Sequence, residues 1–108
     1  MNEGIIVINS KQWQVSIATT SWEISQGLGG LESIPPMTGM YFHVCCPARI
    51  LSVTTYPMLF PIDIAFIHEN TIVDIARNAL PDQIINSNQP ACSFLEVNAN
   101  ELLGIVVG

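Results

Sequence analysis

The most apolar run of the sequence is Pro57-Met58-Leu59-Phe60-Pro61-Ile62-Asp63-Ile64-Ala65-Phe66-Ile67, which carries one acid, Asp63, in its middle. A short polar break, His68-Glu69-Asn70, separates it from a second apolar run at positions 71–76. Two β-rich runs joined by a few turn-forming residues predict a β-hairpin. We expect this hairpin to form the core against which the rest of the chain packs.

The composition favours a small globular domain that self-associates. The chain has 108 residues, of which 49% are hydrophobic and only 11% charged. This length predicts one domain, residues 1–108, with enough buried surface for a core. So few charges leave apolar side chains on the surface, which predicts an exposed apolar patch and a homo-oligomer.

The charge balance argues against polyanionic partners. The formal net charge is −6, and the fixed cations are Lys11, Arg49 and Arg77. Three scattered cations do not neutralise a run of phosphates, so we expect neither nucleic-acid binding nor attachment to an anionic membrane.

The sequence also predicts a cytoplasmic protein. Its longest apolar stretch, residues 50–67, is interrupted by two prolines and by Asp63, so no transmembrane helix is expected. The N-terminus lacks the basic region and long apolar segment of a signal peptide. Three cysteines at irregular spacing predict reduced thiols, not a disulfide framework.

Elsewhere the pattern predicts mostly strands. Thr20-Ser21-Trp22-Glu23 fits a capping box at the start of a short helix, which Gly27, Gly29 and Gly30 would end. The prolines at 57 and 61 predict a corner at a sheet edge or crossing. Further strands are expected at 4–9, 12–18, 39–45, 49–55 and 92–97, a long loop at 77–90, a helical turn at 98–103 and a strand or tail at 104–108. The predicted fold class is α+β, mostly β, with a small twisted antiparallel or mixed sheet curling to a partial barrel and one or two short helices.

Several of these stretches, in this order, resemble a known family. They include Gly39-Met40-Tyr41-Phe42, Pro61-Ile62-Asp63-Ile64-Ala65-Phe66-Ile67 and Leu95-Glu96-Val97-Asn98-Ala99. The sequence is similar, over positions 15–108, to the widespread prokaryotic family called domain of unknown function 192. The resemblance implies an architecture of mixed strands with one or two short helices, and no particular reaction.

The sequence departs from that family pattern in two places. Members usually carry a Trp-Met-Lys-Asn-Thr type segment where this chain has Thr54-Thr55-Tyr56-Pro57-Met58. A family site built on those polar groups would here be lost or rebuilt. Members also tend to have a further strand after Gly104-Ile105, and its absence would leave a sheet edge open to a second copy.

Asp63 is the residue that most invites a functional interpretation. A carboxylate in an apolar strand is costly unless it is hydrogen-bonded, to backbone N–H groups or to neighbouring hydroxyls. We favour a structural acid that fixes the proline corner over a ligand-contacting or catalytic acid. The candidate ligand-binding residues are Asp63, Thr55, Tyr56, Arg77 and Glu96.

The remaining candidates have simpler explanations. Glu96 could form a carboxylate pair with Asp63, although a solvated acid at a strand edge is the simpler reading. Arg77 could receive an anion or pair with Asp74 or Asp82. His43-x-Cys45-Cys46 has metal-ligand residue types, but a structural zinc site needs four ligands at recognisable spacing, so neither a metal nor a cofactor is expected.

Two functions remain open from the sequence. The favoured one is a small non-enzymatic module that binds a small molecule or a protein and acts as a homo-oligomer. The alternative is a small hydrolase or isomerase that uses Asp63 with Thr55, Tyr56, Glu96 or Arg77, and it requires these side chains to meet in one pocket.

Overall fold

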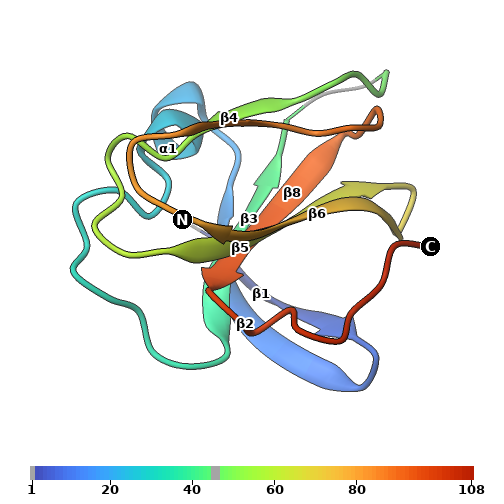
Figure 1. Cartoon of the computed structure of the whole chain (residues 1–108), viewed down its shortest axis with the longest axis horizontal. Coiled ribbons are helices and arrows are strands. Elements are labelled where there is room, and N and C mark those ends of the chain that lie inside the picture. Colours follow the sequence, from blue (N-terminus) through green and yellow to red (C-terminus); the bar gives the residue numbers. More distant parts are fainter. Residues whose placement is uncertain (1, 45–46) are drawn as a thin grey trace.

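The computed structural model describes residues 2–44 and 47–108, and Figure 1 shows their arrangement. Strands dominate these residues. The elements are β1 (Asn2–Ile8), β2 (Lys11–Ala18), α1 (Ser21–Gln26), β3 (Thr38–His43), β4 (Ser52–Thr54), β5 (Ile62–His68), β6 (Thr71–Ala79), β7 (Ile84–Asn86) and β8 (Ser93–Asn98).

The main sheet has six strands in the order β1-β2-β3-β8-β5-β6. The β2–β3 pair is parallel and the other pairs are antiparallel, so the sheet is mixed. It curls so that the β1–β2 hairpin turns away from β5 and β6, while β4 and α1 lie on the other side (Figure 1). Strands β4 and β7 form a separate two-stranded sheet. The predicted fold class is confirmed.

The predicted β5–β6 hairpin forms, as does a second hairpin of β1 and β2, and their turns explain why. Glu69 and Asn70, between β5 and β6, have φ angles of 50° and 62°; Asn9 and Ser10, between β1 and β2, have 50° and 67°. Two-residue turns with both φ angles positive match the twist of antiparallel strands, and asparagine tolerates this conformation best among the non-glycine residues. Within the expected β5–β6 hairpin, β5 is an interior strand between β8 and β6, whereas β6 is an edge of the main sheet.

Strands β5 and β8 are buried on both faces, which explains why β5 is apolar at nearly every position. One face packs into a core with Leu28 of the segment after α1 and Val53 of β4. The other face packs against Trp13 of β2 and Leu102 of the C-terminal segment. Two cores therefore sandwich the centre of the sheet.

Some boundaries differ from the sequence-based expectations. The strand expected at 49–55 is reduced to β4, preceded by a single bridge between Arg49 and Ala91. The expected long loop at 77–90 contains the end of β6 and all of β7. The expected helical turn at 98–103 is a series of turns, and residues 104–108 form a tail whose last N–H donates to the Ile72 carbonyl. In the described part of the chain, no helix has the length and hydropathy needed to cross a bilayer.

Candidate ligand-binding cavity

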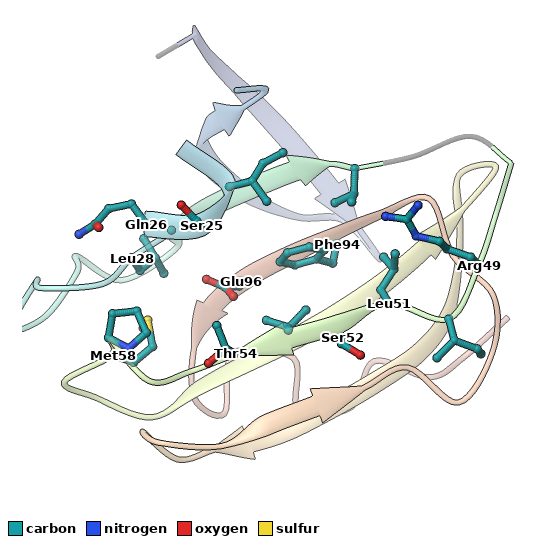
Figure 2. Close-up of a pocket in the computed structure, with 16 residues that line it drawn as sticks. Ser25, Gln26, Leu28, Arg49, Leu51, Ser52, Thr54, Met58, Phe94 and Glu96 are labelled. Carbon is teal, nitrogen blue, oxygen red and sulfur yellow. The ribbon is translucent and has the colours of Figure 1, made fainter. Parts of the chain in front are cut away.

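A cavity of about 440 Å³ opens between α1 and β4, with β8 as its floor. Figure 2 shows Glu96 and Phe94 projecting into it from β8, between residues of the α1 segment on one side and of β4 on the other. The lining residues are Ile24, Ser25, Gln26, Gly27, Leu28, Val44, Arg49, Ile50, Leu51, Ser52, Val53, Thr54, Pro57, Met58, Phe94 and Glu96. Apart from Glu96, the deep part is apolar, and the rim carries polar side chains, as is usual for small-molecule sites.

Glu96 is the acid at the bottom of this cavity. It sits in the middle of β8, paired with Met40 of β3 on one side and Ile64 of β5 on the other. Only 4% of Glu96 is exposed, because both neighbouring strands and the cavity walls cover it. Burial raises the pKa of the Glu96 carboxyl from 4.5 to about 8, so the group is mostly protonated at pH 7. The expectation of a solvated strand-edge acid was therefore wrong.

Within residues 2–44 and 47–108, neither a charge nor a hydrogen bond compensates the burial of Glu96. Among the described residues, no hydrogen bond or ion pair reaches its carboxyl group, and burial is the one cause of its pKa shift. The one other charged side chain among the lining residues is Arg49, which is exposed and lies beyond Phe94 at the far end of the cavity (Figure 2). Glu96 thus keeps its hydrogen-bonding capacity for something that enters the cavity.

The first wall of the cavity depends on the capping of α1. The Thr20 hydroxyl accepts from the Glu23 N–H at 3.1 Å, and the Glu23 carboxylate accepts from the Thr20 N–H at 3.1 Å, so the predicted capping box is confirmed. These backbone hydrogen bonds lower the pKa of Glu23. The helix ends at Gly27, whose φ of 52° and ψ of −132° suit glycine alone. A Cβ at Gly27 would lie 3.6 Å from Oε1 of Glu96, so this glycine leaves backbone directly beside the acid.

The α1 segment is joined to the proline corner by close backbone contact. The Gly30 N–H donates to the Pro57 carbonyl at 2.9 Å. A Cβ at Gly29 would lie only 2.5 Å from Cβ of Pro57, so no larger residue fits without movement. Through this contact, the corner that follows β4 closes one end of the cavity.

The opposite wall is β4, which β7 and its neighbours hold in place. Val53 of β4 pairs with Ile85 of β7. Leu51 exchanges hydrogen bonds with Ser87: its N–H donates to the Ser87 hydroxyl at 3.0 Å, and its carbonyl accepts from the Ser87 N–H at 2.9 Å. This pairing aims Leu51 and Val53 at the floor of the cavity while Ser52 and Thr54 remain at the rim.

Asp63 lies on the other side of the sheet from Glu96. It pairs with Val97 in the β5–β8 register, one position away from Glu96, so the two carboxyl groups project from opposite faces. Asp63 is 1% exposed, and its two oxygens accept from the Asn78 N–H at 2.8 Å and the Leu102 N–H at 3.0 Å. The carboxylate pair suggested by the sequence is wrong, because the sheet itself separates the two acids.

The other sequence-predicted site residues do not converge on the cavity either. The buried Thr55 hydroxyl donates to the Leu80 carbonyl at 2.6 Å and accepts from the Gln83 N–H at 2.8 Å, which fixes the loop after β6. Tyr56 is 62% exposed. Arg77 donates to two carbonyl groups of the C-terminal segment, so it pairs with neither acid considered from the sequence. Of the five candidates, Glu96 alone lines the cavity.

The metal-ligand residue types noted at positions 43–46 fall only partly within the described residues. His43 is exposed at the end of β3, whereas Cys45 and Cys46 lie outside the described residues. Within residues 2–44 and 47–108, no three His, Cys, Asp or Glu side chains gather in a way that could hold a metal ion. The sequence contains one sign of the cavity: the acid Glu96 lies between apolar residues in an expected strand.

These features define a class: a small, β-rich domain with a curled mixed sheet and a cavity over its central strands. Within this class, the chain belongs to the domain of unknown function 192 family, described as "Uncharacterized ACR", whose model matches residues 5–108. The resemblance inferred from the sequence is confirmed. A comparison with curated proteins found no match.

Two solved structures share the fold. One, from Sinorhizobium meliloti 1021, is described as "a putative transcription regulator"; it is 30% identical, with a TM-score of 0.82, over 90% of this chain and 78% of that chain. The other, from Novosphingobium aromaticivorans DSM 12444, is described as a protein of unknown function; it is 22% identical, with a TM-score of 0.81, over 100% of this chain and 90% of that chain.

Proposed function

We propose that this protein is a non-enzymatic binding module that takes up a small, mainly apolar molecule in the cavity between α1 and β4. The observation that carries this proposal is Glu96: a carboxyl group that is 4% exposed, lines the cavity and has no partner among the described residues. Buried polar groups are nearly always hydrogen-bonded, so an acid left unpaired at the bottom of a cavity favours a ligand that completes it.

The size and lining of the cavity support a small ligand. Its volume of about 440 Å³ is near the lower end of the range for ligand sites, which is roughly 300–1,000 Å³. Leu28, Met58 and Phe94 supply the apolar contacts, and the rim supplies hydroxyl and amide groups from Ser25 and Gln26. A molecule with an apolar body and one polar head, directed at Glu96, matches this distribution.

The enzymatic alternative receives no support from the arrangement of residues. It required Asp63 to share a pocket with Thr55, Tyr56, Glu96 or Arg77. Asp63 is instead saturated by two backbone N–H groups on the opposite face of the sheet from Glu96. We therefore do not propose the hydrolase or isomerase based on Asp63.

The Sinorhizobium relative is described as a transcription regulator. We do not propose that this chain contacts DNA directly. The net charge is −6, and Arg77, one of three fixed cations, is engaged with backbone carbonyls. Lys11 and Arg49 are exposed but lie on separate segments. A surface with so few cations gains little from counterion release on a nucleic acid.

We further propose that a second copy pairs with this one along β1. This strand is the edge of the main sheet, and its outward-facing Ile5 and Val7 are 61% and 58% exposed. Antiparallel pairing of two β1 strands about Ile5 would place the single charge, Glu3, opposite Val7, so no like charges would meet. Analytical ultracentrifugation of the natural chain and of Ile5→Lys tests this: a dimer that the substitution splits is expected, and a monomer at high concentration refutes it.

Three matched probes test binding in the cavity: 3-phenylpropan-1-ol, 3-phenylpropylamine and 3-phenylpropanoate, followed by backbone amide NMR shifts. At least one is expected to shift the amides of Leu28, Met58 and Glu96. Thr54→Trp places an indole at the rim and should abolish these shifts. Thr71→Trp changes another exposed strand threonine, which does not line the cavity, and should preserve them. If no probe shifts these amides, or if both variants behave alike, the proposal fails.

A further inference from the structure

The proposed function does not specify the chemical class of the ligand. The residues around Glu96 indicate which class of ligand fits the cavity. Gly27 lies beside the carboxyl group of this glutamate, and the cross-strand neighbours Met40 and Ile64 are apolar. The cavity is also lined by Ser25 and Gln26 of α1 and by Ser52 and Thr54 of β4. Arg49 is the one other charged side chain lining the cavity within the described residues.

Arg49 does not neutralise Glu96. The Arg49 side chain is exposed and separated from Glu96 by the Phe94 ring (Figure 2). A guanidinium close to a carboxyl group would lower the pKa of that group, yet burial alone accounts for the raised pKa of Glu96. What Glu96 lacks is therefore a positive charge.

Glu96 is also easily ionised near neutral pH. With a pKa of about 8, Glu96 loses its proton close to neutral pH, so only a small bias is needed to ionise it. A cation that enters the cavity supplies that bias, because an ion pair is stronger at a buried carboxyl group than in bulk water. The negative net charge of the chain, −6, further favours a cation over an anion.

We propose that the cavity selects protonated amines with an apolar body, and that binding of the ammonium group ionises Glu96. The N–H groups of the ligand would donate to the Glu96 carboxylate, while its apolar part would lie against Phe94, Leu28 and Met58. This inference rests on the proposed binding function and specifies its ligand. One proton leaves the Glu96 carboxyl group for each ammonium bound, and it passes to the buffer.

The proton release gives the proposal a pH signature. Below pH 8 the free protein holds the proton that the bound form has lost, so the affinity for an amine should rise by up to tenfold per pH unit from pH 6 to pH 8. The amine itself stays charged over this interval, because alkylamines resemble lysine, with a pKa of about 10.4. A neutral ligand that accepts a hydrogen bond from protonated Glu96 would show constant affinity, or lower affinity as the pH rises.

Isothermal titration calorimetry tests this with the same three probes, at pH 6, 7 and 8, in phosphate and in Tris. Because the two buffers differ in ionisation enthalpy, the comparison counts the protons released. The expected result is that 3-phenylpropylamine binds with pH-dependent affinity and releases about one proton at pH 6 and about half a proton at pH 8, where half of Glu96 is already ionised. Glu96→Gln should abolish this dependence and weaken amine binding at pH 8 by tenfold or more. Glu69→Gln removes an exposed carboxylate in the β5–β6 turn and should change neither.

The other outcomes distinguish a failure of the amine proposal from a failure of the proposed binding function. If the alcohol binds and the amine does not, or if amine binding is independent of pH, the amine class is refuted while the binding cavity stands. If 3-phenylpropanoate binds best, Arg49 governs the site and the amine class is again refuted. If none of the three probes binds, the proposed function fails together with this inference.

Discussion

Replacing Glu96 by glutamine should make the folded protein clearly more stable at alkaline pH and leave its stability below pH 4.5 nearly unchanged. Glutamine has the shape of a protonated glutamate but cannot ionise, so it keeps the packing between β3 and β5 and removes the titration. The ordinary pKa of a glutamate side chain, taken for the unfolded chain, is 4.5, whereas the pKa of Glu96 in the folded protein is about 8. Between these values, the folded chain retains a proton that the unfolded chain has released.

The sign and size of the effect follow from this proton. Where the folded state binds more protons than the unfolded state, the free energy of unfolding falls as the pH rises. The contribution of Glu96 is therefore fully present below pH 4.5 and is lost by pH 8. At about 1.4 kcal/mol per pH unit, the loss approaches about 5 kcal/mol. Since small domains are stable by about 5–15 kcal/mol, this loss is a large share of the total.

Urea denaturation of both proteins at pH 5, 6, 7, 8 and 9 measures the effect. All other groups titrate alike in the two chains, so the difference between their unfolding free energies isolates Glu96. The expected difference is smallest at pH 5, at about 1 kcal/mol, and grows in favour of Glu96→Gln up to pH 8. Parallel pH profiles for the two proteins would show that Glu96 is solvated or paired, and the reasoning about the cavity would be refuted. Glu69→Gln, on the exposed turn, should give a profile parallel to that of the natural chain.

Three further substitutions test the supports of the site, each by urea denaturation at pH 7. Asp63→Asn leaves one of two buried backbone N–H groups without an acceptor and should cost about 1–3 kcal/mol; an unchanged midpoint would contradict the hydrogen bonds assigned to it. Thr20→Ala removes the helix cap and should cost about 1 kcal/mol, and a loss under a few tenths would exclude the capping box as a support. Gly29→Ala forces a methyl group against Pro57 and should cost about 1–3 kcal/mol, whereas Gly4→Ala, which meets a flexible side chain, should cost clearly less; equal costs would count against the close contact.

Local chemistry made much of the fold predictable from the sequence. The Thr20-to-Glu23 spacing specifies a capping box without any tertiary contact, and it forms as expected. The turn at Glu69-Asn70 is likewise a local preference, placed between two β-rich runs. Strand β7 was missed because it has only three residues, Ile84–Asn86, and exists through pairing with β4 about thirty positions earlier. Short strands of this kind depend on their neighbours more than on their own propensity.

The cavity was less predictable because it is made by segments far apart in sequence. Its floor comes from β8, one wall from α1 and the other from β4. Whether Glu96 is solvated or buried depends on where β8 stands in the sheet. An acid in an edge strand would reach water, but β8 is flanked by β3 and β5. Strand order is set by long-range pairing, which no spacing of residues in this sequence revealed.

Asp63 and Glu96 together show what distinguishes a structural acid from an acid available to a ligand. Both are nearly fully buried, both lie in apolar strands, and those strands are adjacent. Asp63 faces backbone N–H groups left free near the end of β6 and in the C-terminal turns, so its charge is satisfied within the protein. Glu96 faces a cavity, so its burial is an uncompensated cost in the protein alone. A domain of this size gains no stability from such a group, and the cost is offset only when a partner enters the cavity. The presence of both acids on opposite faces of one sheet therefore places the structural role with Asp63 and the binding role that we propose with Glu96.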